Sequence, residues 1–216
     1  MKFTKVFIQL FAAGLLISST SCQQQYPDLG DGIFAEFVTS KDTIIIQLFY
    51  DKVPLTVANF IGLAEGSHPM LADSLKGKPY YNGTVFHRVI DNFMIQGGDG
   101  SPAPPSIMDE FDSTLSNVQK TISMANSGPN TGTCQFFINL VDNTYLDFDK
   151  APLTSKHPVF GITVSGFMDG LTMDFSATSG TGIQDKSFVD VKLSATSWIS
   201  SIVMDDDSAL TTPLFG

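Results

Sequence analysis

The chain has 216 residues, of which 43% are hydrophobic and 18 are phenylalanine. This length and apolar content suit one folded domain with its own core, and they exclude a chain that is disordered throughout. The formal net charge is -10. Because so acidic a surface repels phosphate backbones, the composition excludes nucleic acid as a partner.

The N-terminal segment differs from everything after it. Lys2 and Lys5 precede an apolar run over 6–17, and small residues then lead to Cys22. This order is typical of a secretory signal peptide, which we place at 1–21. The apolar run is shorter than the roughly 20 residues that a permanent transmembrane helix needs. We therefore expect export without a lasting transmembrane span.

The position of Cys22, directly after the small residues, resembles the processing site of bacterial lipoproteins. In such sites the cysteine becomes the lipidated first residue of the mature chain. Leu usually stands three positions earlier, where this chain has Ser19, and ordinary cleavage beyond Cys22 is the alternative. We expect lipidation at Cys22, a tether over 22–31, and a protein anchored to a membrane of the bacterial envelope and facing the periplasm.

The second cysteine, Cys134, has no partner for an intramolecular disulfide if Cys22 carries lipid. It lies in an apolar run over 134–140 and has no histidine near it in the sequence. We expect a buried small side chain and not a nucleophile.

The folded domain is expected over 32–204, followed by an acidic C-terminal tail at 205–216. Its first clear element is a strand over 43–50, where β-branched and aromatic residues are dense. Pro54 suits the first turn of a helix, apolar residues then recur at helical spacing, and Gly66 supplies the end.

The rest of the domain is predicted to be mostly β. Over 80–164 the apolar residues form short clusters separated by Gly, Pro, Asn and Asp, as in the short strands of a closed or sandwiched sheet. The three prolines of 101–106 mark a loop. A second helix is predicted around 167–175, and alternation over 188–198 predicts a closing strand.

Four segments together resemble one family, the cyclophilins, which are peptidyl-prolyl cis/trans isomerases. They follow in the expected order as Phe86–Asp99, Ser123–Ile138, Tyr145–Asp147 and His157–Gly161. The resemblance extends over about 43–164 and continues more weakly to Trp198. It implies a closed eight-stranded antiparallel barrel capped by two α-helices, with a peptide-binding groove on its outside.

The resemblance also implies the activity and its residues. The expected reaction is rotation about Xaa-Pro bonds in exported proteins, assisting their folding, with Arg88 as the catalytic group. The expected walls of the proline pocket are Phe93, Met94, Phe137, Leu146 and His157. The expected lining of the backbone groove is Gln96, Ala125, Asn126 and Gln135. We expect a monomer that needs no cofactor and no metal, with proline-containing polypeptides as its partners.

These residue types suit the chemistry. Rotation about a peptide bond must overcome about 18–20 kcal/mol because amide resonance is lost. In the twisted transition state the prolyl nitrogen becomes pyramidal and basic, so a fixed hydrogen-bonding cation stabilises that state more than the planar one. Arg88 offers a permanently charged planar fork, whereas lysine would offer a mobile point charge.

Other motifs in the same segments have simpler interpretations. His87 has no assembled triad, so we expect a structural role for it. The glycine-containing stretches 97–99 and 128–132 lack the Lys-Ser/Thr of a phosphate-binding loop and are expected to be turns. The three histidines are too scattered in sequence for a common metal site.

The chain departs from the family in three places. Asp91-Asn92 stands where Pro-Gly is usual, Tyr145 where many eukaryotic members have Trp, and Phe148–Lys156 is longer than in compact members. The second departure bears on inhibitor binding and the third on substrate choice. Two alternatives stay open: a non-catalytic proline-peptide-binding module or chaperone, and a structural envelope lipoprotein. Arg88 favours the enzyme, because a module that only grips proline needs no transition-state cation.

Overall fold

The computed structural model describes residues 29–39, 43–151 and 156–166, and the backbone of 185–195. Within these ranges the chain forms nine strands, one α-helix and one short 3-10 helix. The strands are β1 (Ile33–Thr39), β2 (Thr43–Leu48), β3 (Thr84–Phe86), β4 (Arg88–Ile90), β5 (Met94–Gly97), β6 (Thr121–Met124), β7 (Phe136–Asn139), β8 (Val159–Ser165) and β9 (Asp185–Ala195). The helices are α1 (Pro54–Glu65) and η1 (Thr144–Leu146). The domain is therefore mostly β, as predicted.

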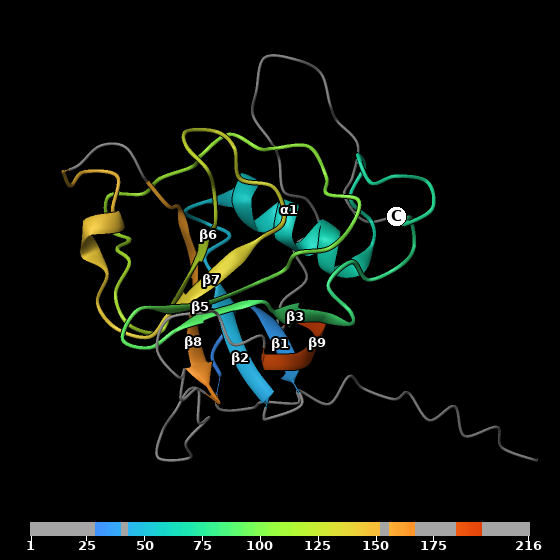
Figure 1. Ribbon diagram of the computed structural model, residues 1–216, viewed down its shortest axis with the longest axis horizontal. Coiled ribbons are helices and arrows are strands. Elements are labelled where there is room, and N and C mark those ends of the chain that lie inside the picture. Colours follow the sequence, from blue (N-terminus) through green and yellow to red (C-terminus); the bar gives the residue numbers. More distant parts are fainter. Residues whose placement is uncertain (1–28, 40–42, 152–155, 167–184, 196–216) are drawn as a thin grey trace, which may run out of the picture.

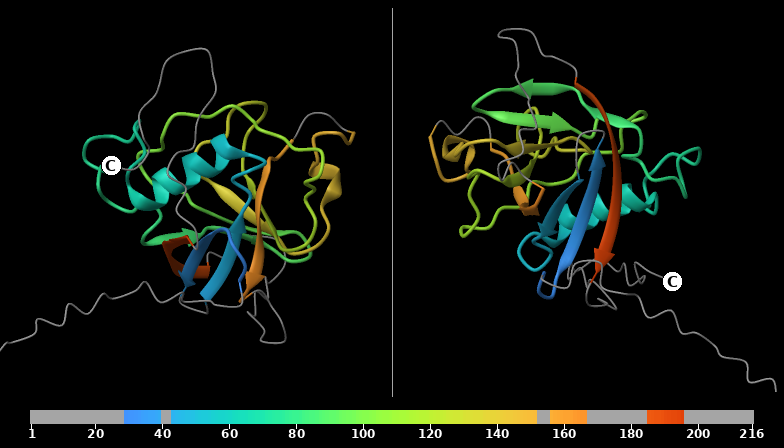
Figure 2. Two further views of the ribbon diagram at one scale, coloured as in Figure 1. Left: turned by 180° about the vertical axis from the view of Figure 1, so that it is seen from behind. Right: turned by 90° about the horizontal axis from the view of Figure 1, so that it is seen from below.

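All nine strands belong to one antiparallel sheet in the order β3-β9-β1-β2-β8-β6-β7-β5-β4. The two strands at its ends, β3 and β4, are separated in the chain only by His87. The sheet is strongly curled, as the views in Figures 1 and 2 show.

The number of strands differs from the eight that were expected. Residues 84–86 pair with β9, whereas residues 88–90 pair with β5. The chain leaves one ladder and enters the other at His87, so one stretch is divided into two strands. The second helix, predicted around 167–175, lies outside the described residues.

Helix α1 confirms the prediction made from Pro54 and Gly66. Pro54 occupies its first turn, and Gly66 ends it in the left-handed conformation, with φ of 73°. At Gly66 a Cβ atom would lie 2.2 Å from the Lys78 carbonyl oxygen, so both the backbone conformation and the space require glycine.

The helix is fixed to the sheet by aromatic packing. The ring of Phe60 lies within stacking or edge contact of four other rings, with centroid distances between 5.2 and 6.0 Å. These partners are Phe37, Tyr81, Phe136 and Phe160. Aromatic contacts of this kind stabilise by about 0.5–1.5 kcal/mol beyond the burial of area. The core thus joins α1 to both halves of the sheet.

Other local predictions agree with the structure within a few residues. The strand expected over 43–50 is β2, and the closing strand expected over 188–198 corresponds to β9 as far as Ala195. The proline-rich stretch 101–106 forms no strand. In the described part of the chain, neither helix is long and apolar enough to cross a bilayer.

Candidate functional site

The site begins at the antiparallel pair of β4 and β5. Arg88 on β4 is directly opposite Gln96 on β5, so their side chains lie on the same face. Arg88 is exposed, and its Nη1 donates a hydrogen bond of 3.2 Å to Oε1 of Gln96. Asn92, in the turn that joins the strands, has φ of 53°. Asparagine tolerates this left-handed conformation, which explains how the turn forms without the usual Pro-Gly.

A line of hydrogen bonds continues from Gln96 across the sheet. Its Nε2 donates to Oε1 of Gln135 over 2.8 Å. Nε2 of Gln135 in turn donates to Oδ1 of Asp99 over 3.0 Å. Gln135 precedes β7, which pairs with β5, so the sheet itself brings these residues together. The sequence-predicted residues Arg88, Gln96 and Gln135 are therefore one connected group, to which the structure adds Asp99.

An apolar cluster lies beside this polar group. Met94, Phe137 and Leu146 form its buried part, with exposed fractions of 1%, 5% and 8%. Partly buried side chains pack around them, namely Phe93, Ala125 and Ile90. Ile90 was not predicted from the sequence, although it ends the strand that begins with Arg88. The structure therefore gathers four of the five predicted pocket residues, and also Ala125, into one cluster.

The fifth predicted pocket residue, His157, contacts the same cluster. Its ring meets that of Phe137 edge to face, with centroids 5.3 Å apart and an interplanar angle of 85°. Its Nδ1 lies 3.1 Å from the carbonyl oxygen of Met124 and must carry the proton, because a carbonyl only accepts. Burial lowers the pKa of His157, against the opposing effects of the Met124 hydrogen bond and the charge of Asp109. A neutral imidazole therefore borders the cluster at pH 7.

The cation and the cluster meet at Phe93. The guanidinium carbon of Arg88 lies 5.9 Å from the centroid of the Phe93 ring, within the range of a cation–π contact. Phe93 also stacks with Tyr145, with centroids 6.4 Å apart and planes 19° apart. Tyr145 is 52% exposed. Arg88 is thus at the rim of an apolar surface and faces solvent.

Ala125 packs against the apolar cluster, and Asn126 follows it in the chain. Nδ2 of Asn126 donates to the carbonyl oxygen of Lys156 over 2.6 Å. Its Oδ1 is buried and has no hydrogen-bond partner in the structure, which is costly unless another group supplies a donor. The N–H of Ala125 donates to the carbonyl oxygen of Gln135 over 2.9 Å. Cys22, the predicted lipidation site, lies outside the described residues.

Behind the apolar cluster lies a buried polar network that the sequence did not reveal. The carboxylate of Asp147 accepts hydrogen bonds from Ser116 Oγ, from the N–H of Asn117 and from Nδ2 of Asn117, at 2.5, 2.7 and 2.9 Å. Nδ2 of Asn117 also donates to the carbonyl oxygen of His157 over 3.2 Å. The network therefore fixes Asp147, beside Leu146, and the backbone at His157.

The network also reaches Phe93. Nδ2 of Asn143 donates to the carbonyl oxygen of Phe93 over 2.9 Å and to Oδ1 of Asn139 over 2.8 Å. Asn139 and Asn143 are both buried, and Asn139 ends β7 after an apolar run. A polar residue at the end of an apolar run was the one feature of the sequence that could have indicated this network. Phe93 lies 50 residues from Asn143 in the chain, so this contact was not predictable.

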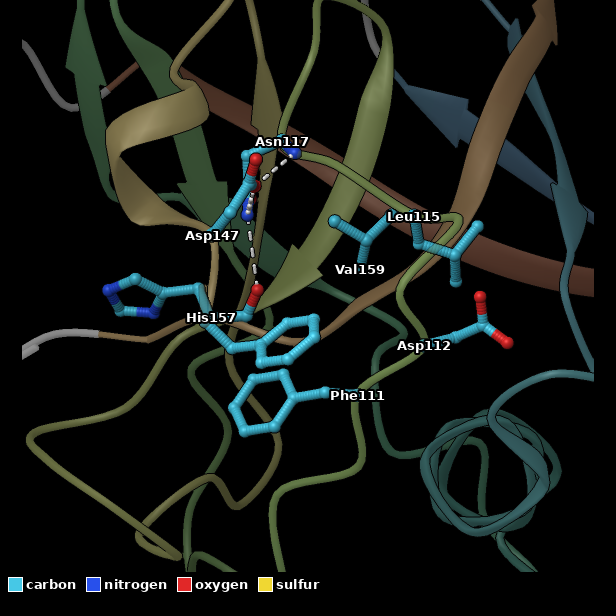
Figure 3. Close-up of a pocket in the computed structure, with 8 residues that line it drawn as sticks. Phe111, Asp112, Leu115, Asn117, Asp147, His157 and Val159 are labelled. Carbon is cyan, nitrogen blue, oxygen red and sulfur yellow. Dashed lines mark hydrogen bonds between the residues drawn. The ribbon is translucent and has the colours of Figure 1, made fainter. Parts of the chain in front are cut away.

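A small hollow, whose lining is drawn in Figure 3, lies next to the site. It is lined by Phe111, Asp112, Leu115, Asn117, Asp147, Phe148, His157 and Val159. Phe111 and Phe148 stack, with ring centroids 5.1 Å apart. Only His157 belongs to both places, so the hollow is a neighbour of the site. Phe148 begins the longer segment that was noted in the sequence.

The expected burial of Cys134 is confirmed, and the backbone turns at Gly98 as predicted for the stretch 97–99. Cys134 is buried, and its Sγ lies 3.5 Å from the hydroxyl of Tyr80. Gly98 has φ of 79°, and a Cβ atom there would lie 2.7 Å from the Phe136 ring. This turn sets Asp99 beside Gln135. Within the described ranges, no three or more His, Cys, Asp or Glu side chains are grouped to hold a metal ion.

Comparisons with known proteins agree with this geometry. Residues 34–182 match the family described as "Cyclophilin type peptidyl-prolyl cis-trans isomerase/CLD". The chain is 37% identical over 155 residues to peptidyl-prolyl cis-trans isomerase A of Mycobacterium tuberculosis, covering 67% of this chain and 80% of that protein. It is also 37% identical over 138 residues to isomerase B of Escherichia coli, with coverage of 60% and 77%.

A solved structure gives the same result. A cyclophilin-type isomerase of Cryptosporidium parvum superposes with a TM-score of 0.58 and 25% identity, covering 76% of this chain and 98% of that one. The chain belongs to the cyclophilin family. It is a peptidyl-prolyl cis-trans isomerase, and its substrates are proline-containing peptides.

Proposed function

We propose that this isomerase acts on exported proteins while anchored by lipid at Cys22 to a bacterial envelope membrane, and that Arg88 is its catalytic group. The observation that carries the catalytic proposal is the meeting of an exposed guanidinium with an apolar cluster at Phe93. A proline ring in contact with the cluster brings its nitrogen close to a fixed cation. The anchor rests on the sequence pattern that ends at Cys22.

In the proposed mechanism Arg88 acts only when the amide twists. The planar Xaa-Pro bond offers a weakly basic nitrogen, and the twisted bond offers a pyramidal one that accepts a hydrogen bond. A guanidinium donor therefore binds the transition state more strongly than the ground state, which is the condition for acceleration. No proton is transferred and no covalent bond forms. The hydrogen bond from Arg88 to Gln96 keeps the donor in place during the rotation.

The apolar cluster holds the ring that does not move. Phe93, Met94, Phe137 and Leu146 offer carbon surface, and His157 adds an imidazole that burial keeps neutral. Contact with the pyrrolidine ring excludes water from the Arg88 side, and electrostatic interactions strengthen as water leaves. The carbonyl that precedes proline then rotates while the ring stays fixed.

The polar residues hold the peptide backbone on either side of the proline. Asn126 follows Ala125 in the chain, and its side-chain amide can bind the substrate backbone. Gln96 and Gln135 line the same groove beside Ala125. Contacts to the substrate backbone do not depend on the side chains of the substrate, so they suit an enzyme that accepts many sequences.

The architecture in this proposal is a closed barrel. With residues 84–90 taken as one strand bent at His87, the strands number eight and the ends of the sheet are joined by the chain itself. A second helix over 167–175 completes the expected fold. We further propose a monomer, since the groove uses residues of one chain.

The alternative is a proline-peptide-binding module or chaperone with the same groove and negligible turnover. A direct test uses soluble protein that begins at Gln23 and a short Xaa-Pro peptide, with the exchange rate measured by NMR. Faster cis/trans exchange at catalytic protein concentration supports the enzyme. Binding of the peptide without faster exchange supports the module.

A further inference from the structure

We propose that Asp99 is a positioning residue, which fixes the direction of the hydrogen bonds through Gln135 and Gln96 and so holds the guanidinium of Arg88 at the apolar cluster. This inference rests on the proposed catalytic role of Arg88. Asp99 touches neither the cluster nor Arg88, and it acts only through the two amides. The line of contacts is Arg88 to Gln96 at 3.2 Å, Gln96 to Gln135 at 2.8 Å, and Gln135 to Asp99 at 3.0 Å.

The two ends of this line are chemically one-sided. An ionised carboxylate only accepts hydrogen bonds, and a guanidinium only donates them. The side-chain amides between them can do either, depending on which way each is turned. Asp99 requires Gln135 to present Nε2, which turns Oε1 of Gln135 toward Gln96. Gln96 must then present its own Nε2, which leaves its Oε1 for Arg88. One orientation satisfies all three contacts.

The backbone around these side chains is already fixed. Gln96 is opposite Arg88 in the β4–β5 pair, and its neighbour Gly97 is opposite Phe136, the residue after Gln135. Asp99 follows the left-handed turn at Gly98, where a Cβ atom would strike the Phe136 ring. Side-chain rotation is thus the main remaining freedom of the group. The hydrogen bonds remove that freedom, as a support for a catalytic residue must.

Loss of the acceptor at Asp99 weakens the preference for this orientation, because the contact between Arg88 and Gln96 is then the only one in the line with a fixed direction. If Gln135 turns over, its Nε2 faces Nε2 of Gln96, and two donors cannot pair. If Gln96 turns over as well, its Nε2 faces the guanidinium of Arg88, which again places donor against donor. Arg88 then leaves Gln96 for solvent, because it is exposed and nothing else in the line can accept from it.

A simpler view is that Asp99 is a solvated carboxylate that only contributes charge. Asp73 provides the matched comparison, since it too is exposed, and it pairs with Lys76 at 2.8 Å away from the line of amides. Asp73→Ala changes the net charge as Asp99→Ala does. A general electrostatic effect on peptide binding would therefore appear in both variants.

The test measures isomerisation by exchange NMR and peptide affinity by titration for Asp99→Ala, Asp73→Ala, Arg88→Ala and the double variant Asp99→Ala/Arg88→Ala. Alanine is used because asparagine would keep an oxygen that accepts from Gln135. We expect Asp99→Ala to slow catalysis by about threefold to tenfold, the range of one net hydrogen bond, with unchanged peptide affinity. Asp73→Ala should match the wild type. In the Arg88→Ala background, Asp99→Ala should have no further effect, because its route to the substrate is gone.

The wild-type protein allows a second measurement that needs no variant. The Nε2 groups of Gln96 and Gln135 should show restricted motion and slowed hydrogen exchange. Free rotation of both amides would overturn the inference, as would a native rate for Asp99→Ala or an equal loss in the Arg88→Ala background. A native rate for Arg88→Ala would instead overturn the catalytic role of Arg88 itself, so the two failures are distinguishable.

Discussion

His157 meets Phe137 edge to face, at a centroid distance of 5.3 Å, with its Nδ1 held 3.1 Å from the Met124 carbonyl oxygen. Burial lowers its pKa from the usual 6.5. Isomerisation should therefore be constant above pH 6.5 and fall at lower pH, once the ring becomes charged beside the apolar cluster. Rates of the wild type and of His157→Phe measured between pH 4.5 and pH 8 check this, because the range includes the ordinary pKa of histidine and stays close to that of carboxyl groups at its acid end. An identical acid loss in His157→Phe would contradict it.

Stability should follow the same sign. A lowered folded-state pKa means that the unfolded chain binds more protons than the folded one as pH falls below 6.5. His68, whose pKa is also lowered by burial, adds to this effect. The contribution of the two histidines to the free energy of unfolding should thus be complete above pH 6.5 and be lost as the pH falls below it. Denaturant titrations at several pH values measure the slope, and stability that rises on acidification from pH 7 to pH 5.5 would contradict the assignment.

The carboxylate of Asp147 should stabilise the fold and the pocket wall together. Asp147→Ala leaves the buried N–H of Asn117 and the partly buried hydroxyl of Ser116 without this acceptor, whereas Nδ2 of Asn117 keeps its bond to the His157 carbonyl oxygen. A buried donor without an acceptor costs about 1–3 kcal/mol. We expect the free energy of unfolding to fall by about 3 kcal/mol in total, with weaker peptide binding because Leu146 adjoins Asp147. Asp149→Ala removes an exposed carboxylate two residues away and is the control, expected to leave both quantities unchanged. If Asp147→Ala and Asp149→Ala change stability and peptide binding equally, the hydrogen bonds of Asp147 make no specific contribution to either.

Tyr145 should decide inhibitor affinity more than turnover. It lies stacked on Phe93 and half exposed at the rim, where many relatives carry an indole N–H. Cyclosporin-type inhibitors should bind Tyr145→Trp more tightly than the wild type by about 1 kcal/mol, the value of one net hydrogen bond, while peptide turnover is retained. Competition titrations measure the difference. Equal affinity would assign control of access to another difference, such as the segment 148–156.

Lipidation at Cys22 predicts a specific mass. The membrane fraction should contain a mature chain that begins at Cys22 and carries two or three acyl groups, and Cys22→Ser should lose the lipid. Intact-mass spectrometry of both fractions gives the answer. An unmodified mature protein in the soluble fraction would contradict the anchor while leaving the isomerase activity untouched.

Local features of the fold were predictable, whereas long-range ones were not. Helix α1 followed from Pro54 and Gly66 because both act through their own backbone angles. The strand order could not be predicted from the sequence, because the pairing of β1 with β9 joins segments about 150 residues apart. The division at His87 depends on which neighbour each half pairs with, and no pattern within 84–90 encodes that.

The site divides in the same way. Its residues were named from motif resemblance, and the structure brings Arg88, the apolar cluster and the groove residues together. Asp99 was in a recognised motif but was assigned to a turn, because its contact with Gln135 spans 36 residues. Asn117 and Asn143 were missed because a buried asparagine looks like a loop residue until its partners are known.

The most direct test of the account is the rate of Arg88→Ala. If Arg88 stabilises the twisted amide, its loss should lower turnover by about 30-fold to 1000-fold, equivalent to about 2–4 kcal/mol, with ground-state peptide affinity almost unchanged. Arg88→Lys should recover only a small part, because the planar fork is lost. Exchange NMR gives the rate, titration gives the affinity, and circular dichroism confirms the fold. Native turnover in Arg88→Ala, or a loss explained wholly by weaker binding, would contradict the central claim.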